Sequence, residues 1–216
     1  MPKETFFNLP PEKRGKINDL AIEEFAENDY KNASISRIVA RAGIAKGSFY
    51  QYFENKQDLY LYLIQRSMQE KAAFLSQNPP LEANNIFAKL RWLFTIGLGF
   101  EFSNPKLARI GFRAIYDDAP LPSETRLVIQ EGSMDFFRQL VQQGKEQGSI
   151  DLEIDTNTAA YMFNMVFINL GDFILKQQKI NPEQLLDEQG QVFTSPAVEK
   201  VFDQVLGILQ SGLRTN

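Results

Sequence analysis

Residues 34–56 read SISRIVARAGIAKGSFYQYFENK, and this stretch decides the fold. Apolar residues recur at helical spacing on both sides of Gly43. Glycine accepts a positive φ at little steric cost, so the pattern predicts short helices over about 34–42 and 45–52 with a tight turn between them. This is the helix-turn-helix pattern, whose second helix is suited to the major groove of DNA.

The two short helices need an apolar core that they share with the helix before them. Pro10-Pro11 opens that first helix, and Asn28-Asp29 ends it. The apolar residues of this first helix fall on one face at helical spacing. The pattern therefore predicts a domain of three helices. The predicted core residues are Leu20, Phe25, Ile35, Ile38, Val39, Ile44, Phe49 and Phe53.

Positive charge is concentrated in the same segment. Residues 31–56 carry five lysines or arginines against one carboxylate, Glu54, although the chain as a whole has a net charge of −4. The overall balance argues against a globally basic nucleic-acid binder. A local basic patch is compatible with a DNA-binding head on an acidic protein.

The composition removes most enzyme classes. The chain of 216 residues contains no cysteine and no histidine. Disulfides, thiolate nucleophiles, cysteine-ligated zinc and histidine general bases are therefore excluded. The run from Ala45 to Ser48 is not a phosphate-binding loop, and no nucleophile elbow is present. We expect neither catalysis nor a cofactor.

The rest of the chain also reads as helix, so the expected fold class is all-α. Asn55 caps a long helix with Asp58 as its capping-box partner, and Gly148 is a left-handed residue at a helix end. The domains expected are a helix-turn-helix domain over 1–54 and a helical effector-binding and dimerisation domain over 55–216. The further helices expected cover about 55–76, 81–102, 105–119, 123–148, 155–178 and 196–213.

Two runs of sequence resemble a known family. FAENDY at 25–30 and SISRIVARAGIAKGSFYQYFENKQDL at 34–59 are similar to the TetR family of bacterial transcriptional regulators. Outside these runs the resemblance is loose. It implies a homodimer that binds a palindromic DNA operator and a small-molecule effector that alters the spacing of the two heads. A repressor is expected, on the habit of the family.

The resemblance and the residue types together give the candidate DNA contacts. Tyr50 and Lys56 match positions where the family binds phosphates, and Ser34 matches a helix cap that contacts a phosphate. Arg37, Lys46, Gly47 and Ser48 lie near the start of a short helix. Gln51 carries an amide that can pair with adenine. Packing, capping or surface roles are the alternatives. The set is Ser34, Arg37, Lys46, Gly47, Ser48, Tyr50, Gln51 and Lys56.

Two residues depart from the family pattern. Ala45 stands where the family commonly has Ser or Thr, which removes an N-cap side chain from the second short helix. Arg37 stands where a capping-box acid is usual. Both departures put the contact set, but not the motif, in question.

The C-terminal half is rich in aromatic residues, which we interpret as a ligand pocket or, alternatively, as core and dimer interface. Polar groups inside an apolar helix need partners if they are buried, and a ligand or a second subunit can supply them. The candidate ligand-binding residues are Phe112, Tyr116, Phe163, Asn164, Phe167, Asn169 and Asp172. The expected effector is apolar or amphipathic.

The most apolar stretch, Thr158–Leu175, contains Asn164, Asn169 and Asp172, so we interpret it as a buried helix rather than a membrane span. The N-terminus lacks the continuous apolar core of a signal peptide, and a cytoplasmic protein is expected. The expected partners are double-stranded operator DNA, a small effector and a second copy of the chain. The alternative function is a helical interaction adaptor that does not bind DNA.

Overall fold

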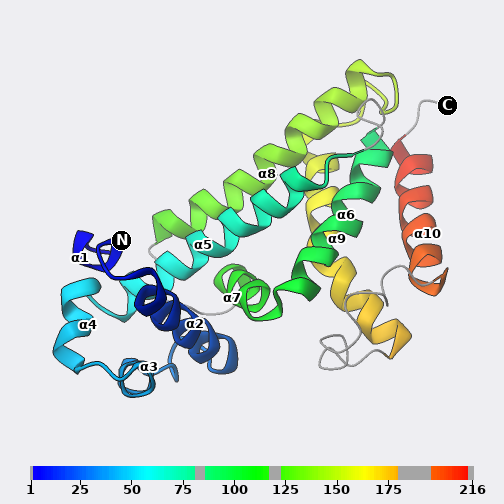
Figure 1. Cartoon of the computed structure of the whole chain (residues 1–216). Coiled ribbons are helices and arrows are strands. Elements are labelled where there is room, and N and C mark those ends of the chain that lie inside the picture. Colours follow the sequence, from blue (N-terminus) through cyan, green and yellow to red (C-terminus); the bar gives the residue numbers. More distant parts are fainter. Residues whose placement is uncertain (1, 81–85, 117–122, 180–195, 214–216) are drawn as a thin grey trace. The chain divides into compact units, whose positions relative to one another are not determined.

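The structure, a computed structural model, describes residues 2–80, 86–116, 123–179 and 196–213. Within these ranges the side chains of residues 102, 112, 115, 116, 123–130, 172 and 175 lie outside the described part. Every regular element in the described ranges is a helix, which confirms the all-α fold class (Figure 1). The chain divides into two compact units, Met1–Ala72 with Asn104–Leu127 and Ala73–Ser103 with Val128–Asn216.

The first unit contains the predicted helix-turn-helix. Its helices are α1 (Glu4–Phe7), α2 (Pro11–Glu27), α3 (Ile35–Ala42), α4 (Lys46–Tyr52), most of α5 (Lys56–Gln77) and α7 (Pro105–Tyr116). The predicted short helices match α3 and α4 to within one residue. Helix α1 was not expected from the sequence.

The core of this unit follows the helical spacing read from the sequence. Pro11 occupies the first turn of α2, where its missing N–H costs nothing. Of the predicted core residues, five are buried and three are half-buried. The buried ones are Phe25, Ile38, Val39, Phe49 and Phe53, and the half-buried ones are Leu20, Ile35 and Ile44.

Helix α5 begins as predicted. The Asn55 side chain accepts a hydrogen bond from the Asp58 N–H at 2.9 Å. The Asp58 carboxylate in turn accepts from the Glu54 N–H at 3.0 Å, one residue earlier than a standard capping box requires. Free N–H groups at the helix start are thus satisfied by side chains.

Helix α7 belongs to the first unit. The Ser67 hydroxyl on α5 donates to the Leu107 carbonyl at 3.0 Å, and a Cβ added at Gly111 would lie 3.1 Å from the same hydroxyl. Helices α5 and α7 therefore pack closely. The domain boundary predicted between residues 54 and 55 stays a prediction. In the structure, α5 as far as Ala72 and all of α7 group with the N-terminal helices.

The second unit is built from α6 (Ile86–Ser103), most of α8 (Ser123–Glu146), α9 (Thr156–Gln178) and α10 (Pro196–Leu213). Figure 1 shows α10 beside α6 and α9, and these helices are in contact. Aromatic rings fill the centre: Phe94 stacks on Phe167 at 5.4 Å and on Phe202 at 6.0 Å. Gly148 has a φ of 67°, which confirms the predicted left-handed position after α8.

Helix α9 is long and apolar enough to cross a membrane by length and composition alone. Its residues Ala159, Phe163 and Ile174 are buried in the core of the second unit, as in a core helix of a globular protein. Tyr161 and Phe173 on the same helix are about half exposed, at 57% and 50%. Only one face of α9 is therefore covered within its own unit.

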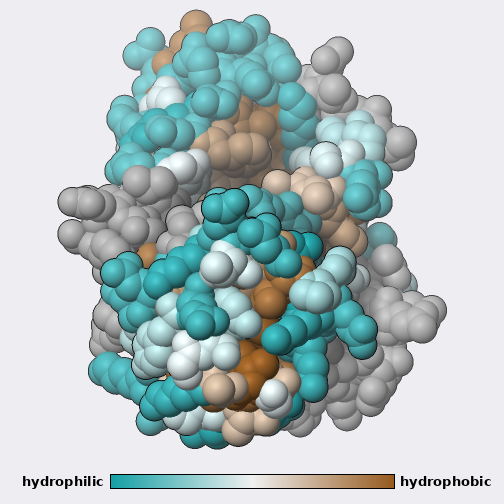
Figure 2. Space-filling view, turned by 60° about the vertical axis from the view of Figure 1, so that its left-hand side comes forward, coloured by the Kyte–Doolittle hydropathy of each residue, from teal (hydrophilic) through white to brown (hydrophobic). Residues whose placement is uncertain are grey.

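Large hydrophobic side chains reach the surface at several places in the described part of the chain. On the face that Figure 2 presents, hydrophobic residues form narrow bands bordered by hydrophilic ones. Exposed large hydrophobic side chains in the described part include Phe7, Tyr50, Phe136, Leu152 and Ile208. Where such residues cluster on a helix face, they mark a surface that binds a partner.

Candidate nucleic-acid interface

The start of α3 is capped from two helices. The Ser34 hydroxyl accepts a hydrogen bond from the Arg37 N–H at 3.4 Å, and the Ser34 N–H donates to the Glu24 carboxylate at 2.8 Å. A capping box takes its acid from the third helical position, which Arg37 occupies here. Glu24 of α2 supplies the missing acid, so the departure noted in the sequence is compensated from another helix.

Arg37 holds this carboxylate in place. Its Nε lies 3.0 and 3.1 Å from the two Glu24 oxygens, and its Nη2 donates to the Asn32 carbonyl at 2.7 Å. The Glu24 side chain is only 4% exposed, and a buried charge needs such partners. Burial raises the pKa of Glu24, but hydrogen bonds from Arg37 and from the Ser34 N–H outweigh it, and the pKa lies below 4.5.

The turn between α3 and α4 has the predicted geometry. Gly43 has a φ of 72°, in the left-handed region that favours glycine. Its N–H donates to the Ala40 carbonyl at 3.2 Å, and the Ile44 N–H donates to the Val39 carbonyl at 3.0 Å. These two bonds close α3 and set the direction in which α4 leaves the turn.

Helix α4 has one anchored face and one open face. Phe49 and Tyr52 are buried, as is Phe53 directly after the helix. The opposite face is exposed and carries Lys46, Gly47, Tyr50 and Gln51. Ser48 lies between the faces and is half-buried. Four of the predicted DNA contacts are therefore brought together on one accessible surface.

The N-terminus of α4 is open as well. Ala45 makes no side-chain cap, as the sequence predicted. A Cβ added at Gly47 would meet no atom within 4 Å. The protein's own packing therefore does not require glycine at this position, whereas a closely approaching DNA backbone would.

Lys56 binds backbone carbonyls of its own chain, and its contact with a phosphate stays a prediction. Its Nζ donates to the carbonyls of Tyr30, Ala33 and Lys31, at 2.7, 3.0 and 3.3 Å, and lies 4.6 Å from the centre of the Tyr30 ring. An ammonium has three N–H donors, and all three have acceptors here. Lys56 thus ties the start of α5 to the loop between α2 and α3.

The candidate ligand residues whose side chains are described pack against aromatic rings or make hydrogen bonds. Phe163 is fully buried against Phe137, and Phe167 packs on Phe94 and Phe137. The Asn164 side chain accepts a hydrogen bond from the Ser133 hydroxyl at 2.7 Å. Asn169 is exposed and donates to the Met165 carbonyl of its own helix.

The remaining three ligand candidates, Phe112, Tyr116 and Asp172, have side chains that lie outside the described residues. Phe112 and Tyr116 belong to α7 in the first unit, whereas Asp172 belongs to α9 in the second.

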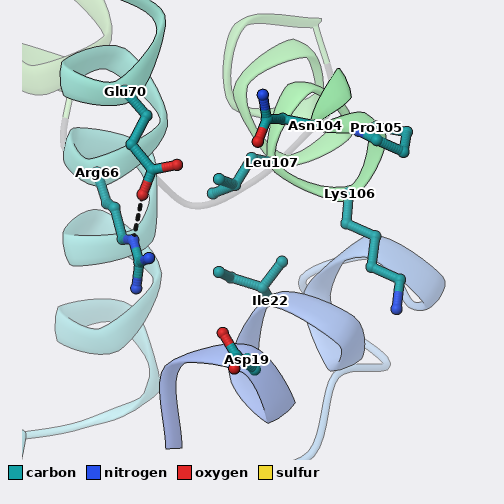
Figure 3. A pocket seen from close by; sticks show the side chains of 8 residues that line it. All are labelled: Asp19, Ile22, Arg66, Glu70, Asn104, Pro105, Lys106 and Leu107. Atoms are coloured by element: carbon teal, nitrogen blue, oxygen red, sulfur yellow. Dashed lines mark hydrogen bonds and ion pairs between the residues drawn. The ribbon is translucent and has the colours of Figure 1, made fainter. Parts of the chain in front are cut away.

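Two cavities are formed by other residues. One of about 390 Å³ lies among α2, α5 and α7, where Ile22 and Leu107 face each other and the Arg66–Glu70 ion pair forms one wall (Figure 3). The other, of about 240 Å³, lies between α6 and α8 and has Trp92 and Phe136 in its lining. Within the described residues, no cluster of three or more acidic side chains is arranged to hold a metal ion.

Comparison with known proteins settles the family. The family model of the bacterial regulatory proteins of the tetR family matches residues 17–63, and that of the tetracyclin repressor-like C-terminal domain matches residues 84–214. The chain belongs to the TetR family. The resemblance noted over 25–59 is thereby confirmed and extends to the C-terminal part.

Individual relatives support the same assignment. A TetR family transcriptional regulator from Chloroflexus aurantiacus J-10-FL is 51% identical, covers 100% of both chains and superposes with a TM-score of 0.86. FadR from Bacillus halodurans, 24% identical with a TM-score of 0.60 over 93% of this chain and 99% of that one, shares the fold. The fatty acid metabolism regulator protein of Bacillus subtilis (strain 168) is 42% identical over 53 residues, which span 24% of this chain and 27% of that protein.

Sequence reasoning missed Glu24 as part of the TetR-family head. The signal was present, because Glu24 falls on the apolar face of α2 together with Ile17, Ala21 and Phe25. A carboxylate on a buried face needs a cation or several N–H donors. The cationic residue that departs from the capping-box pattern, Arg37, is that partner.

Replacing Glu24 with Gln is expected to lower the free energy of unfolding by about 1–3 kcal/mol at neutral pH, because a charged hydrogen-bonding partner is lost. The folded-state pKa of Glu24 is depressed, so its contribution is fully present above pH 4.5 and is lost as pH falls through the folded-state value. The difference between the two proteins should therefore shrink on acidification. Urea unfolding between pH 3 and 7 measures this, with exposed Glu27→Gln as the control. A difference independent of pH would contradict the assignment.

Replacing Lys56 with Met is expected to lower the free energy of unfolding by about 1–3 kcal/mol, because three backbone carbonyls lose a charged donor. Because its donors are already used, the salt dependence of DNA binding should stay unchanged. Exposed Lys31→Met is the control for stability. If Lys56→Met left stability intact and reduced the salt slope by about one, the lysine would contact a phosphate directly.

Proposed function

We propose that this TetR-family protein is a ligand-responsive repressor that binds a palindromic DNA operator as a homodimer in the cytoplasm. The observation that carries the proposal is the two-sided helix α4. Its inner face is anchored by Phe49 and Tyr52, and its outer face presents Lys46, Gly47, Tyr50 and Gln51 to solvent. A rigid helix with an open polar face suits insertion into a major groove.

The proposed contacts divide into two kinds. Gln51 and Lys46 are candidates for base edges, since an amide pairs with adenine and an ammonium with guanine. Tyr50, Ser48 and Ser34 are candidates for phosphates, which position the protein without reading sequence. Arg37 keeps its Nη1 available while its other nitrogens bind Glu24 and Asn32. No observation favours the adaptor alternative.

The second unit offers a surface for a second copy. Helix α9 exposes Tyr161, Met162, Met165 and Phe173, and the neighbouring α10 exposes Ile208. Apolar residues gathered on two adjacent helices are stabilised when they are covered. A palindromic operator needs two heads related by a twofold axis, and a self-complementary patch provides that symmetry.

The head has a mechanical connection through which an effector could act. The Glu23 carboxylate binds Lys106 of α7 at 2.7 Å and Arg41 of α3 at 2.6 Å. Hydrogen bonds from Lys106 and then Arg41 lower the pKa of Glu23. Arg113 of α7 also donates to the Phe25 carbonyl at 3.1 Å. A displacement of α7 would therefore be transmitted to α2 and α3.

We propose an apolar or amphipathic effector, because the centre of the second unit is a cluster of phenylalanine rings rather than a polar site. The candidate ligand residues stay those predicted from the sequence. Among them, Phe163, Asn164 and Phe167 lie on α9 and contact α8. The Bacillus subtilis relative is named for fatty acid metabolism, but its similarity covers only 53 residues. That name therefore carries no argument about the effector of this chain.

Replacing Gly47 with Ala is expected to change stability and DNA binding in opposite directions. Alanine favours a helix over glycine, so the free energy of unfolding should rise by up to about 1 kcal/mol. The added methyl group occupies the space that the DNA approaches, so affinity should fall at least about tenfold. The probe is a duplex selected by the wild-type protein from a random-sequence pool, measured by fluorescence anisotropy.

The matched control is Gly132→Ala in α8, where an added Cβ also meets no atom within 4 Å. It should raise stability without changing DNA affinity. Full DNA affinity in Gly47→Ala would contradict the placement of α4 in the groove, and failure of the wild-type protein to select any duplex would contradict the proposed function.

Replacing Ile208 with Glu is expected to weaken the dimer by at least about 2 kcal/mol, about 30-fold in the dissociation constant, because a carboxylate replaces an apolar side chain in the proposed interface. Light scattering over a concentration series measures it. Leu152→Glu is the control, since both residues are 73% exposed and Leu152 lies outside α9 and α10. An equal effect of the two changes, or a wild-type protein that is monomeric at micromolar concentration, would refute the proposed interface.

A further inference from the structure

The C-terminal end of helix α4 is capped by the residues around α1. The last carbonyls of a helix have no partner within the helix. Here the Tyr52 carbonyl accepts from the Lys3 N–H at 2.8 Å, and the Tyr50 carbonyl accepts from the Lys3 Nζ at 2.9 Å. The Gln51 carbonyl, between them, accepts from the Thr5 hydroxyl.

An aromatic contact fixes the same segment to the head. Phe6 is 0% exposed, and its ring lies 4.8 Å from Phe53, 5.6 Å from Tyr62 and 6.1 Å from Tyr52. Phe6 therefore packs against the residues that follow α4 and against α5. The buried Phe6 side chain therefore fixes the positions of Lys3 and Thr5, whose own side chains are exposed, for their hydrogen bonds to α4.

Helix α4 depends on outside support more than an average helix does. It has seven residues, includes Gly47, and has no side-chain cap at its N-terminus. Helices this short are unstable in isolation. The Lys3 ammonium at its C-terminal end also interacts favourably with the helix dipole.

We propose that Lys3–Phe7, here called the clamp, positions α4 for operator recognition, although neither Lys3 nor Thr5 reads a base. The inference rests on the proposed function. The clamp binds the backbone of Tyr50 and Gln51, whose side chains are candidate DNA contacts on the open face. Loss of the clamp lets the last turn of α4 fray, and both side chains lose their fixed direction.

The alternative is that Lys3 contacts a DNA phosphate directly, since its side chain is cationic and exposed. Thr5 separates the two cases because it is uncharged. Thr5→Val keeps the shape of the side chain and removes only the hydroxyl that caps Gln51. Thr5→Ser keeps the hydroxyl and serves as the conservative control, and Lys3→Met is the second clamp variant.

The experiment measures binding of each variant to the duplex selected by the wild-type protein and to poly(dI-dC), over a range of salt concentrations. Thr5→Val is expected to lower affinity for the selected duplex by about three- to tenfold, as for one lost hydrogen bond, without changing nonspecific binding or the salt slope. Lys3→Met should do the same with a larger effect, and Thr5→Ser should bind like the wild type.

Amide hydrogen exchange in the free protein gives a readout that needs no DNA. Peptides that cover α4 should exchange faster in Thr5→Val and Lys3→Met, while peptides from α2 should not change. If the wild-type protein selected no duplex, the proposed function would fail, and exchange would still test the clamp.

Three results would overturn the inference. The first is unchanged exchange and unchanged affinity in both clamp variants. The second is faster exchange with full affinity and selectivity for the selected duplex. The third is a normal Thr5→Val together with a Lys3→Met that weakens binding to both DNAs and lowers the salt slope, which would assign Lys3 to a phosphate.

Discussion

The buried carboxylate of Glu24 joins α2 to α3, the helix from which the recognition helix α4 continues. It accepts the Ser34 N–H at the start of α3 and hydrogen bonds from the Nε and Nη2 of Arg37, while it is itself part of α2. Helix α3 has eight residues and α4 has seven, so neither is stable without tertiary contacts. The direction of α4 is set through α3 and the turn at Gly43, and the Glu24 carboxylate is one of the contacts that fix α3 to α2, beside the Arg41–Glu23 ion pair and the buried apolar core.

The head is assembled by side chains that cap backbone groups far away in sequence. Glu24 serves the start of α3, Lys56 serves the loop before α3, and Lys3 with Thr5 serves the end of α4. Each of these contacts satisfies polar groups that would otherwise weaken a short helix. Lys3, Arg37 and Lys56 near the motif are therefore engaged in contacts within the protein. This explains why a net count of positive charge overstates the number of available contacts.

Local features of the sequence predicted the local features of the structure. The positive φ of Gly43, the uncapped Ala45, the cap at Asn55 and the left-handed Gly148 all follow from residue type and spacing. The caps made by Glu24 and Lys56 were not predictable in this way, because they join segments that helical periodicity treats separately. Helix α1 was missed for a different reason. Four residues are too few for a periodic signal, and the stability of this helix comes from the burial of Phe6.

The aromatic residues of the second unit show another property that the sequence does not determine. The sequence offered a ligand pocket or a core for Phe163 and Phe167; Phe163 is buried in the core of the second unit and Phe167 packs against that core. Periodicity could not distinguish a cavity wall from a packed core, because both place an aromatic side chain on the inner face. Here the Phe167 ring contacts the rings of both Phe94 and Phe137. An effector that enters this region must therefore separate rings that are in contact in the structure described here.

In the proposed function, the outer face of α4 enters the major groove of DNA at two related half-sites. Methylation interference on the selected duplex tests it directly, because dimethyl sulfate modifies guanine N7, which lies in the major groove. The account predicts that N7 methylation blocks binding at two positions about one helical turn, or 10 base pairs, apart or a multiple of that spacing. Binding that tolerates N7 methylation throughout the duplex, or interference confined to the minor groove, would contradict it.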